Sequence, residues 1–193
     1  MELIEKVVLA NKGQSIAIKS KNEVAGPFHA TLRWKTAVDL DLHCFYKLKD
    51  EPKKASGLFS SLKQAFDGSG NQEGQVYFAS KGNKDKAPWI TLDEDSGVGD
   101  TAGDNEENMH FWDIGKVEHV IIVANIFGKK TSFANYDGVV IVKGGGREFE
   151  VPLSEKERGS WSVVARIDNS GDSPILHNVN ITQKDEPILQ NFL

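Results

Sequence analysis

Hydrophobic and polar residues alternate with a period of two along much of the chain. The clearest case is the stretch VDLDLHCFYK at 38–47, and FHATLRWK at 28–35 repeats the pattern. One face of the first stretch carries Val38, Leu40, Leu42, Cys44 and Tyr46. Successive side chains of a β-strand point to opposite faces of its sheet, so this period predicts strands that bury one face in a core.

A second pattern is a nearly continuous apolar run. The stretch VEHVIIVANIF at 117–127 is rich in Val and Ile, which predicts a central strand buried on both faces. Further β-branched runs predict strands at 15–19, 75–79, 89–92, 138–143, 149–153, 161–168 and 178–182. About ten short strands separated by Gly, Asn, Asp and Pro favour an all-β fold. We expect a two-layer antiparallel β-sandwich that occupies residues 1–193 as a single domain.

Helical signals are sparse by comparison. The stretch GLFSSLKQAF at 57–66 places apolar residues at helical spacing. Ser154 and Glu157 have the spacing of a capping box, in which the first residue caps a helix and the second lies in its first turn. We therefore expect one or two short helices beside the strands.

The composition is that of an ordinary soluble domain, with 39% hydrophobic and 26% charged residues. A single cysteine, Cys44, excludes a disulfide within the chain and suits a reducing compartment. No apolar stretch approaches the roughly 20 residues that a membrane helix needs, and residues 1–14 do not form a secretory signal. We expect a cytoplasmic protein that neither inserts into a membrane nor, lacking a basic patch, binds nucleic acid.

The acidity of the chain is concentrated in one segment. Residues 91–108 read TLDEDSGVGDTAGDNEEN and contain no basic residue. The acids are Asp93, Glu94, Asp95, Asp100, Asp104, Glu106 and Glu107. These seven exceed the formal net charge of −5, so the rest of the chain carries a small positive charge. Something must offset the repulsion within this segment.

A bound calcium ion is one answer, because calcium takes 6–8 oxygen ligands in flexible geometry. Gly97, Gly99 and Gly103 would let the loop turn tightly and direct carbonyl groups inward. Asp93 and Asp95 follow a predicted strand end with a spacing of two, which places both side chains on one face.

The same spacing occurs at Asp39 and Asp41, inside a predicted strand, where Asp is disfavoured. Two such pairs and the acidic loop together predict a site for one or two calcium ions, since like charges side by side repel unless a cation intervenes.

Other interpretations of these acids stay open. The loop could be solvated, with Asp39 and Asp41 paired to Arg33 or Lys35. Magnesium is less favoured, because it keeps most of its water. Zinc and iron are not indicated, because the candidate nitrogen and sulfur ligands do not have the spacing of a metal site. These candidates are His29, His43, His110, His119 and Cys44. The loop also lacks the residue order of an EF-hand.

Four stretches, in order along the chain, resemble the TerD-like tellurium-resistance and stress-response family, and its TerA branch in particular. They are LANKGQSIAIK at 9–19, LRWKTAVDLDLHCFYKL at 32–48, WITLDEDSGVGDTAGDNEENMHF at 89–111 and YDGVVIV at 136–142. The second contains the family's Asp-Leu-Asp strand and the third its acidic loop. The chain after Asn178 lies outside the resemblance.

The resemblance implies a calcium-binding β-sandwich in the cytoplasm, acting in bacterial stress response with other Ter-family proteins, some of them at the membrane. The ligands that it implies are Asp39, Asp41, Asp93, Asp95, Asp100, Asp104 and Glu107. The family's loop ends in Gly-Asp-Gly-Asp-Asp-Glu, whereas this loop reads GDTAGDNEEN. That difference leaves open whether one or two ions bind, and whether Glu106 or Glu107 faces the ion.

Two rival functions remain. The Asp-x-Asp pairs are those of a metal-dependent glycosyltransferase, but the chain shows neither the alternating strands and helices of a nucleotide-binding domain nor a phosphate-binding loop, so we expect no enzyme. A calcium-dependent module that binds lipid headgroups or sugars is the other alternative, with 57–66 lying at a membrane interface. The prediction that we carry forward is a non-enzymatic, calcium-binding scaffold of a stress and tellurite-resistance system.

Overall fold

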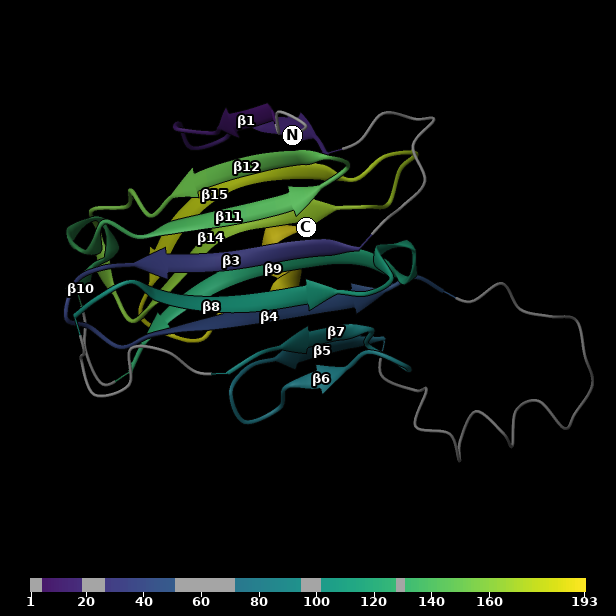
Figure 1. Ribbon diagram of the computed structural model, residues 1–193, viewed down its shortest axis with the longest axis horizontal. Coiled ribbons are helices and arrows are strands. Elements are labelled where there is room, and N and C mark those ends of the chain that lie inside the picture. Colours follow the sequence, from purple (N-terminus) through teal and green to yellow (C-terminus); the bar gives the residue numbers. More distant parts are fainter. Residues whose placement is uncertain (1–4, 19–26, 51–71, 95–101, 128–130) are drawn as a thin grey trace, which may run out of the picture.

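The computed structural model describes residues 5–18, 27–50, 72–94, 102–127 and 131–193, which are built mainly of β-strands (Figure 1). The first sheet has the order β1 (Glu5–Val8), β12 (Arg147–Pro152), β11 (Val139–Gly144), β3 (Phe28–Trp34), β8 (Asn105–Phe111), β7 (Ile90–Leu92) and β6 (Gly82–Asn83). The second has the order β2 (Ser15–Ala17), β15 (Ile175–Gln183), β14 (Trp161–Asp168), β9 (Val117–Ile126), β4 (Leu40–Leu48) and β5 (Glu73–Val76). Strands β10 (Thr131–Ser132) and β13 (Arg158–Gly159) form a separate pair.

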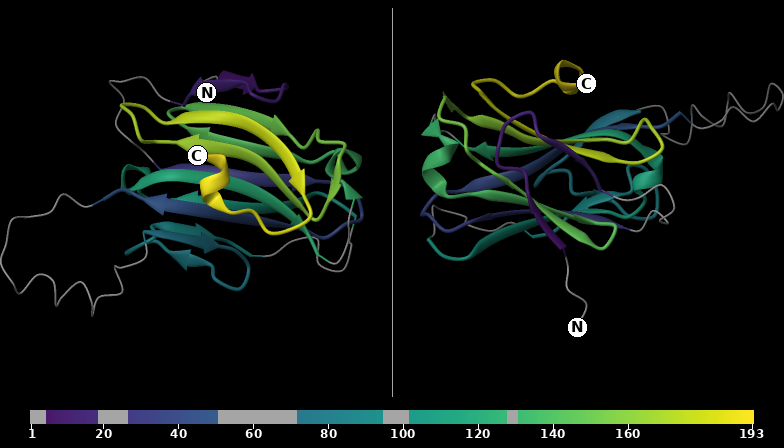
Figure 2. Two further views of the ribbon diagram at one scale, coloured as in Figure 1. Left: turned by 180° about the vertical axis from the view of Figure 1, so that it is seen from behind. Right: turned by 90° about the horizontal axis from the view of Figure 1, so that it is seen from above.

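The two sheets lie face to face with a hydrophobic core between them (Figures 1 and 2). Both sheets contribute alternate residues: Phe28, Leu32 and Trp34 of β3, and Leu40 and Leu42 of β4, are almost fully buried. Pairing is antiparallel except between β1 and β12. The prediction of a chain made mostly of strands is confirmed.

Strand β9 has the central position that its apolar run predicted. It pairs with β4 on one side and with β14 on the other. Its inner side chains belong to the main core, whereas Ile121 and Val123 lie in a second cluster on the outer face. The 3-10 helix η3 (Leu189–Phe192) covers that cluster, and Figure 2 shows it on the outer side of the second sheet.

The largest difference from the sequence prediction is β8, because the sequence pattern places residues 105–108 in the acidic segment and predicts no strand at 105–111. Their inward side chains are Asn105, Glu107, Met109 and Phe111. The alternation is present in NEENMHF, but two of its inward positions are polar and hide the period. The short strands β1, β6, β10 and β13 were also not predicted.

The two stretches predicted to be helical have different outcomes. The stretch 57–66 lies outside the described residues. The prediction of a helix at Ser154 is wrong. The chain there forms a loop, in which Glu155 Oε1 accepts hydrogen bonds from the backbone N–H groups of Lys156 and Glu157. The described helices are η1 (Ile114–Lys116), η2 (Phe133–Tyr136) and η3. None of them is long and apolar enough to cross a membrane.

On the outer face of the second sheet, His43 is buried among aromatic rings. Its imidazole stacks on Tyr77 with ring centroids 5.5 Å apart and meets Trp161 edge to face at 4.9 Å. Gln75 Nε2 lies 2.9 Å from Nδ1, and because an amide N–H can only donate, Nδ1 accepts. Burial lowers the pKa of His43 to about 4, so the ring is neutral near pH 7.

This burial predicts a loss of stability in mild acid. The folded-state pKa of His43 lies below the ordinary value of 6.5, so its contribution is present above pH 6.5 and is lost as the pH falls toward 4. Between pH 7 and pH 5 the loss is about 2 kcal/mol. Denaturant unfolding of wild type and His43→Phe at both pH values measures it. Between the two pH values, His43→Phe should lose about 2 kcal/mol less stability than wild type does. The variant His177→Gln, at a half-buried site, should lose nearly as much stability as wild type.

Candidate functional site

Several predicted ligands are brought to one end of the sheets by the directions of the strands. Strand β3 ends at Trp34 and β4 begins at Leu40, while β7 ends at Leu92 and β8 begins at Asn105. The end of β3 and the starts of β4 and β8 lie at the left of Figure 1, and β7 points toward that side. Among the predicted ligands, Asp39, Asp41, Asp93, Asp104 and Glu107 are described there, whereas Asp95 and Asp100 lie outside the described residues.

Glu107 occupies the most distinctive position. Its side chain points inward from β8 and is 2% exposed. Glu107 Oε2 accepts a hydrogen bond from the backbone N–H of Leu42 at 2.6 Å. Leu42 pairs with β9 on one side, but β5 pairs with β4 only from Cys44 to Lys47. The carboxylate therefore meets β4 where β5 does not cover its edge, and it links the two sheets.

Asp39 and Asp41 flank Leu40, whose side chain is fully buried in the core. Both acids are half-buried, and Asp39 Oδ1 is shielded from solvent. Asp41 directly precedes Leu42, the residue whose amide binds Glu107. Asp39 and Asp41 therefore lie at the start of β4, close in sequence to the residue whose amide Glu107 binds.

Asp93 closes the base of the acidic segment. Its Oδ1 accepts from the backbone N–H of Asn108 at 2.9 Å, and its Oδ2 accepts from Asn108 Nδ2 at 2.8 Å. The Asp93 backbone N–H in turn donates to the carbonyl of Asn108 at 3.0 Å. These contacts give Asp93 a structural role in holding the two ends of the segment together.

Asp104 and Glu106 form ion pairs with two basic residues at the end of β3. Glu106 pairs with Arg33, and Asp104 pairs with Lys35, which follows the last residue of the strand. Asp104 Oδ1 lies 3.2 Å from Lys35 Nζ, and the Asp104 side chain is 89% exposed. Arg33 Nε donates to Glu106 Oε2 at 2.6 Å on the outer face of the first sheet. Burial alone would raise the pKa of Glu106, but hydrogen bonds from Arg33 and Asn108 outweigh it and lower that pKa.

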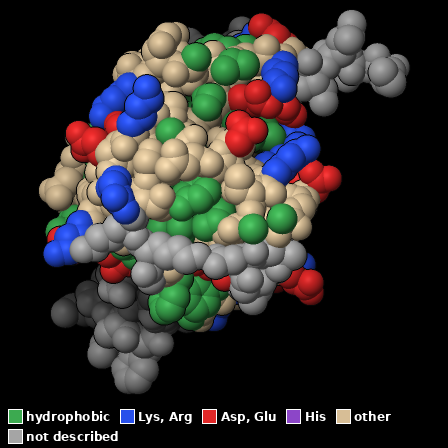
Figure 3. All heavy atoms as spheres, turned by 90° about the vertical axis from the view of Figure 1, so that its left-hand side faces the viewer, with side chains coloured by type: hydrophobic (Ala, Val, Ile, Leu, Met, Phe, Trp, Pro, Cys, Tyr) green, Lys and Arg blue, Asp and Glu red, His purple; other side chains and the backbone are tan. Residues whose placement is uncertain are grey.

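These ion pairs concern one alternative that the sequence left open, in which Arg33 or Lys35 would pair with Asp39 and Asp41. Arg33 and Lys35 bind Glu106 and Asp104, two acids other than the pair proposed for them. They border a groove of about 380 Å³ that Asp137 also lines. Figure 3 views this end of the molecule, where the described acidic and basic side chains are interspersed. Glu107 points into the interior and Glu106 away from it.

The described acids do not complete a metal site by themselves. In the parts of the chain that the structure describes, no three His, Cys, Asp or Glu side chains converge closely enough to hold an ion. Asp39, Asp41 and Glu107 offer only oxygen donors, and this chemistry fits a hard cation such as calcium. A complete site would also need further oxygen donors, from other carboxylates, backbone carbonyls or water.

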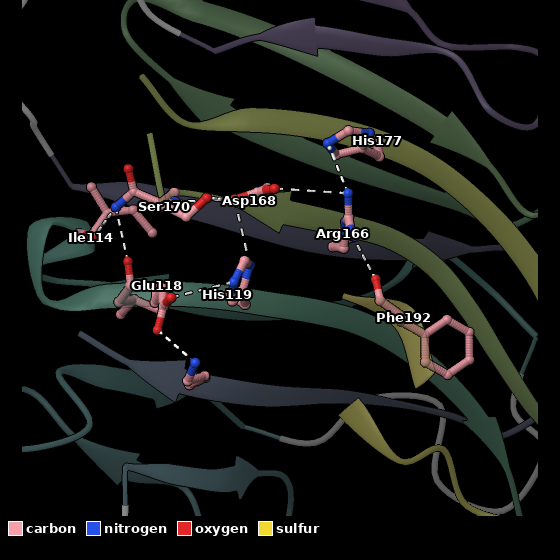
Figure 4. A network of polar contacts seen from close by, with 11 residues as sticks. Ile114, Glu118, His119, Arg166, Asp168, Ser170, His177 and Phe192 are labelled. Carbon is pink, nitrogen blue, oxygen red and sulfur yellow. Dashed lines mark hydrogen bonds and ion pairs between the residues drawn. The ribbon is translucent and has the colours of Figure 1, made fainter. Parts of the chain in front are cut away.

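A second polar cluster lies on the outer face of the second sheet (Figure 4). His119 Nδ1 is 3.5 Å from Asp168 Oδ1, and His119 Nε2 is 3.6 Å from Glu118 Oε1. Ser170 Oγ donates to Asp168 Oδ1 at 2.6 Å, so this hydroxyl pairs with the carboxylate and not with the imidazole. Burial acts to raise the pKa of Asp168, but the hydrogen bonds from Ser170 lower it overall. The arrangement cross-links β9 and β14.

Arg166 extends the same cluster toward the C-terminus. Its Nη2 lies 3.2 Å from His177 Nε2, and its Nη1 donates to the carbonyl of Phe192 at 2.7 Å. The cluster therefore ties η3 to the second sheet (Figure 4).

Comparison of the chain with models of protein families found no match, and comparison with curated proteins found none either. The resemblance to the TerD-like family accordingly remains a prediction from the sequence motifs.

Proposed function

We propose that the chain is a calcium-binding, non-enzymatic β-sandwich of the TerD type. It would serve as a structural or scaffolding component of a bacterial stress and tellurite-resistance system, acting in the cytoplasm with other Ter-family proteins. The observation that carries the proposal is the buried carboxylate of Glu107, which binds the Leu42 amide beside Asp39 and Asp41.

The energetic reason is the cost of burying negative charge. A carboxylate removed from water is unfavourable unless charge and hydrogen bonds compensate for it. Calcium offers two positive charges and accepts 6–8 oxygens at varied angles. An ion among Asp39, Asp41 and Glu107 would therefore convert a repulsive group of acids into a stabilising one.

The proposed ligand set contains more than these three acids. Asp95 and Asp100 would supply the remaining carboxylates from the acidic segment. Asp93 and Asp104 would have to exchange their contacts with Asn108 and Lys35 for the ion. The first ion therefore draws on Glu107 and the Asp-Leu-Asp strand, and a second ion would need Asp93 or Asp104.

The mechanism that we propose is neutralisation. Glu107 belongs to the first sheet, Asp41 belongs to the second, and Asp39 directly precedes that strand, so an ion among them would hold the two sheets together at this end. It would also fix the acidic segment against β4. The resulting surface, with the groove beside Arg33 and Lys35, would then have a defined shape for a partner protein.

Calcium should raise the melting temperature. A ligand at 100 times its dissociation constant stabilises the folded state by about 2.7 kcal/mol, which for a chain of this size is a shift of roughly 5–10 °C. Thermal melts in chelator, in millimolar calcium and in millimolar magnesium measure the shift. Asp39→Asn combined with Asp41→Asn should abolish it. Identical midpoints for wild type in chelator and in calcium would reject the proposal.

Adjacent glutamates on β8 offer a matched pair of variants. Glu107→Gln keeps an oxygen for the Leu42 amide but removes the charge, so it should abolish the calcium-induced shift while leaving the protein as stable in chelator as wild type, or more so. Glu106→Gln removes only a half-exposed ion pair with Arg33, costing under about 1 kcal/mol, and should keep the shift. The reverse pattern in the melts would show that Glu106 binds the ion.

A further inference from the structure

Two histidines far apart in the sequence meet on the outer face of the first sheet. His29 of β3 and His110 of β8 are direct cross-strand partners, 81 positions apart. Their Nδ1 atoms are 2.8 Å apart, and the rings are perpendicular with centroids 4.8 Å apart. Both side chains are half-buried, so the pair is reachable from solvent. It lies at the far end of β3 and β8 from Trp34 and Asn105.

The short contact defines the protonation of the pair. Two imidazole nitrogens at this distance form an N–H···N hydrogen bond, so one ring donates and the other accepts. Burial, and then the positive charges of His110 and Lys143, lower the pKa of His29. The acceptor ring is therefore neutral near pH 7, which is the form that binds metal ions.

Neighbouring residues hold the rings in place. Trp112 stacks on the His110 ring with centroids 5.7 Å apart. Trp112 Nε1 donates to Thr91 Oγ1 at 2.9 Å, and Thr91 is the partner of His110 on β7. On the other side, Lys143 is the β11 partner of His29, and its Nζ pairs with Glu148 at 3.2 Å, which offsets its charge.

We propose that His29 and His110 form a chelating site for a divalent transition-metal ion, Cu²⁺ or Ni²⁺ in preference to Zn²⁺, bound through the Nδ1 atoms of both rings. The ion takes the place of the shared proton, which moves to Nε2 of its own ring. A small rotation of each ring turns both lone pairs toward one ion. In the described part of the chain no third His, Cys, Asp or Glu joins the pair, so water completes the coordination.

The separation of the nitrogens selects the metal. With metal–nitrogen bonds of about 2.0–2.1 Å, a separation of 2.8 Å gives an N–metal–N angle of about 90°. That angle suits the square-planar or tetragonal geometry of Cu²⁺ and Ni²⁺, whereas tetrahedral Zn²⁺ needs nitrogens roughly 3.4 Å apart. The site differs in donor type and in place from the oxygen-rich end proposed for calcium.

Isothermal titration calorimetry of the full chain tests the proposal, in excess calcium and a non-coordinating buffer at pH 7.5. Wild type should bind one Cu²⁺ or Ni²⁺ per chain at micromolar concentrations, and Zn²⁺ more weakly. His29→Gln and His110→Gln should each weaken binding by at least about tenfold. His177→Gln is the matched control, because that half-buried histidine lies on the second sheet, and it should bind as wild type does.

Tryptophan fluorescence supplies a second readout that reports the place of the ion. Bound Cu²⁺ should quench Trp112, which stacks on His110, and Trp112→Phe should remove most of that quenching while Cu²⁺ still binds. Circular dichroism checks that each variant is folded.

Three results would overturn the proposal: no binding of Cu²⁺ or Ni²⁺ by wild type, equal binding by all variants, or loss in only one of the two histidine variants. Its outcome is independent of the calcium proposal, because a wild type that shows no calcium-dependent melting can still bind Cu²⁺ here.

Discussion

The contact between Glu107 and the Leu42 amide is the constraint on which the proposed site depends. It places a charge-bearing group from one sheet against the edge of β4 that β5 does not cover. It also fixes which face each residue of β8 presents. A slip of one residue in the pairing of β3 with β8 would exchange Glu107 with Glu106, so that the carboxylate now bound to Arg33 would enter the interior.

The same pair of strands carries different chemistry on its two faces. Inside, β3 and β8 supply apolar side chains together with Asn105 and Glu107. Outside, cross-strand partners form a ladder: Arg33 with Glu106, Thr31 with Asn108, and His29 with His110. Asn108 links this ladder to the acidic segment through Asp93. Oxygen donors therefore gather at one end of the strands and nitrogen donors at the other, which is why the two proposed sites would select different classes of metal.

The local pattern of apolar and polar residues was enough to predict the strands that bury one face or both faces. The stretch 161–168 is β14, and the apolar run beginning at Val117 is β9, because their side chains meet a continuous core. It was not enough for β8, where Asn105 and Glu107 occupy inward positions. The acids of the site were identifiable as a set, but the inward direction of Glu107 and the pairing of Arg33 and Lys35 depend on register. The contact of His29 with His110 depends on register too, since no spacing along the chain encodes a partner 81 positions away.

The apolar run of β9 also implied a layer that two sheets alone do not supply. A strand in one of two stacked sheets needs only one apolar face, the face toward the other sheet. Ile121 and Val123 are nevertheless as deeply buried on the outer face of β9 as Val120 and Ile122 are on the inner face. The C-terminal segment provides the cover: Leu189 joins the outer cluster, and Arg166 holds the carbonyl of Phe192. The C-terminal helix η3 is therefore a third layer over the second sheet, and the apolar run of β9 is the sequence feature that indicates such a cover.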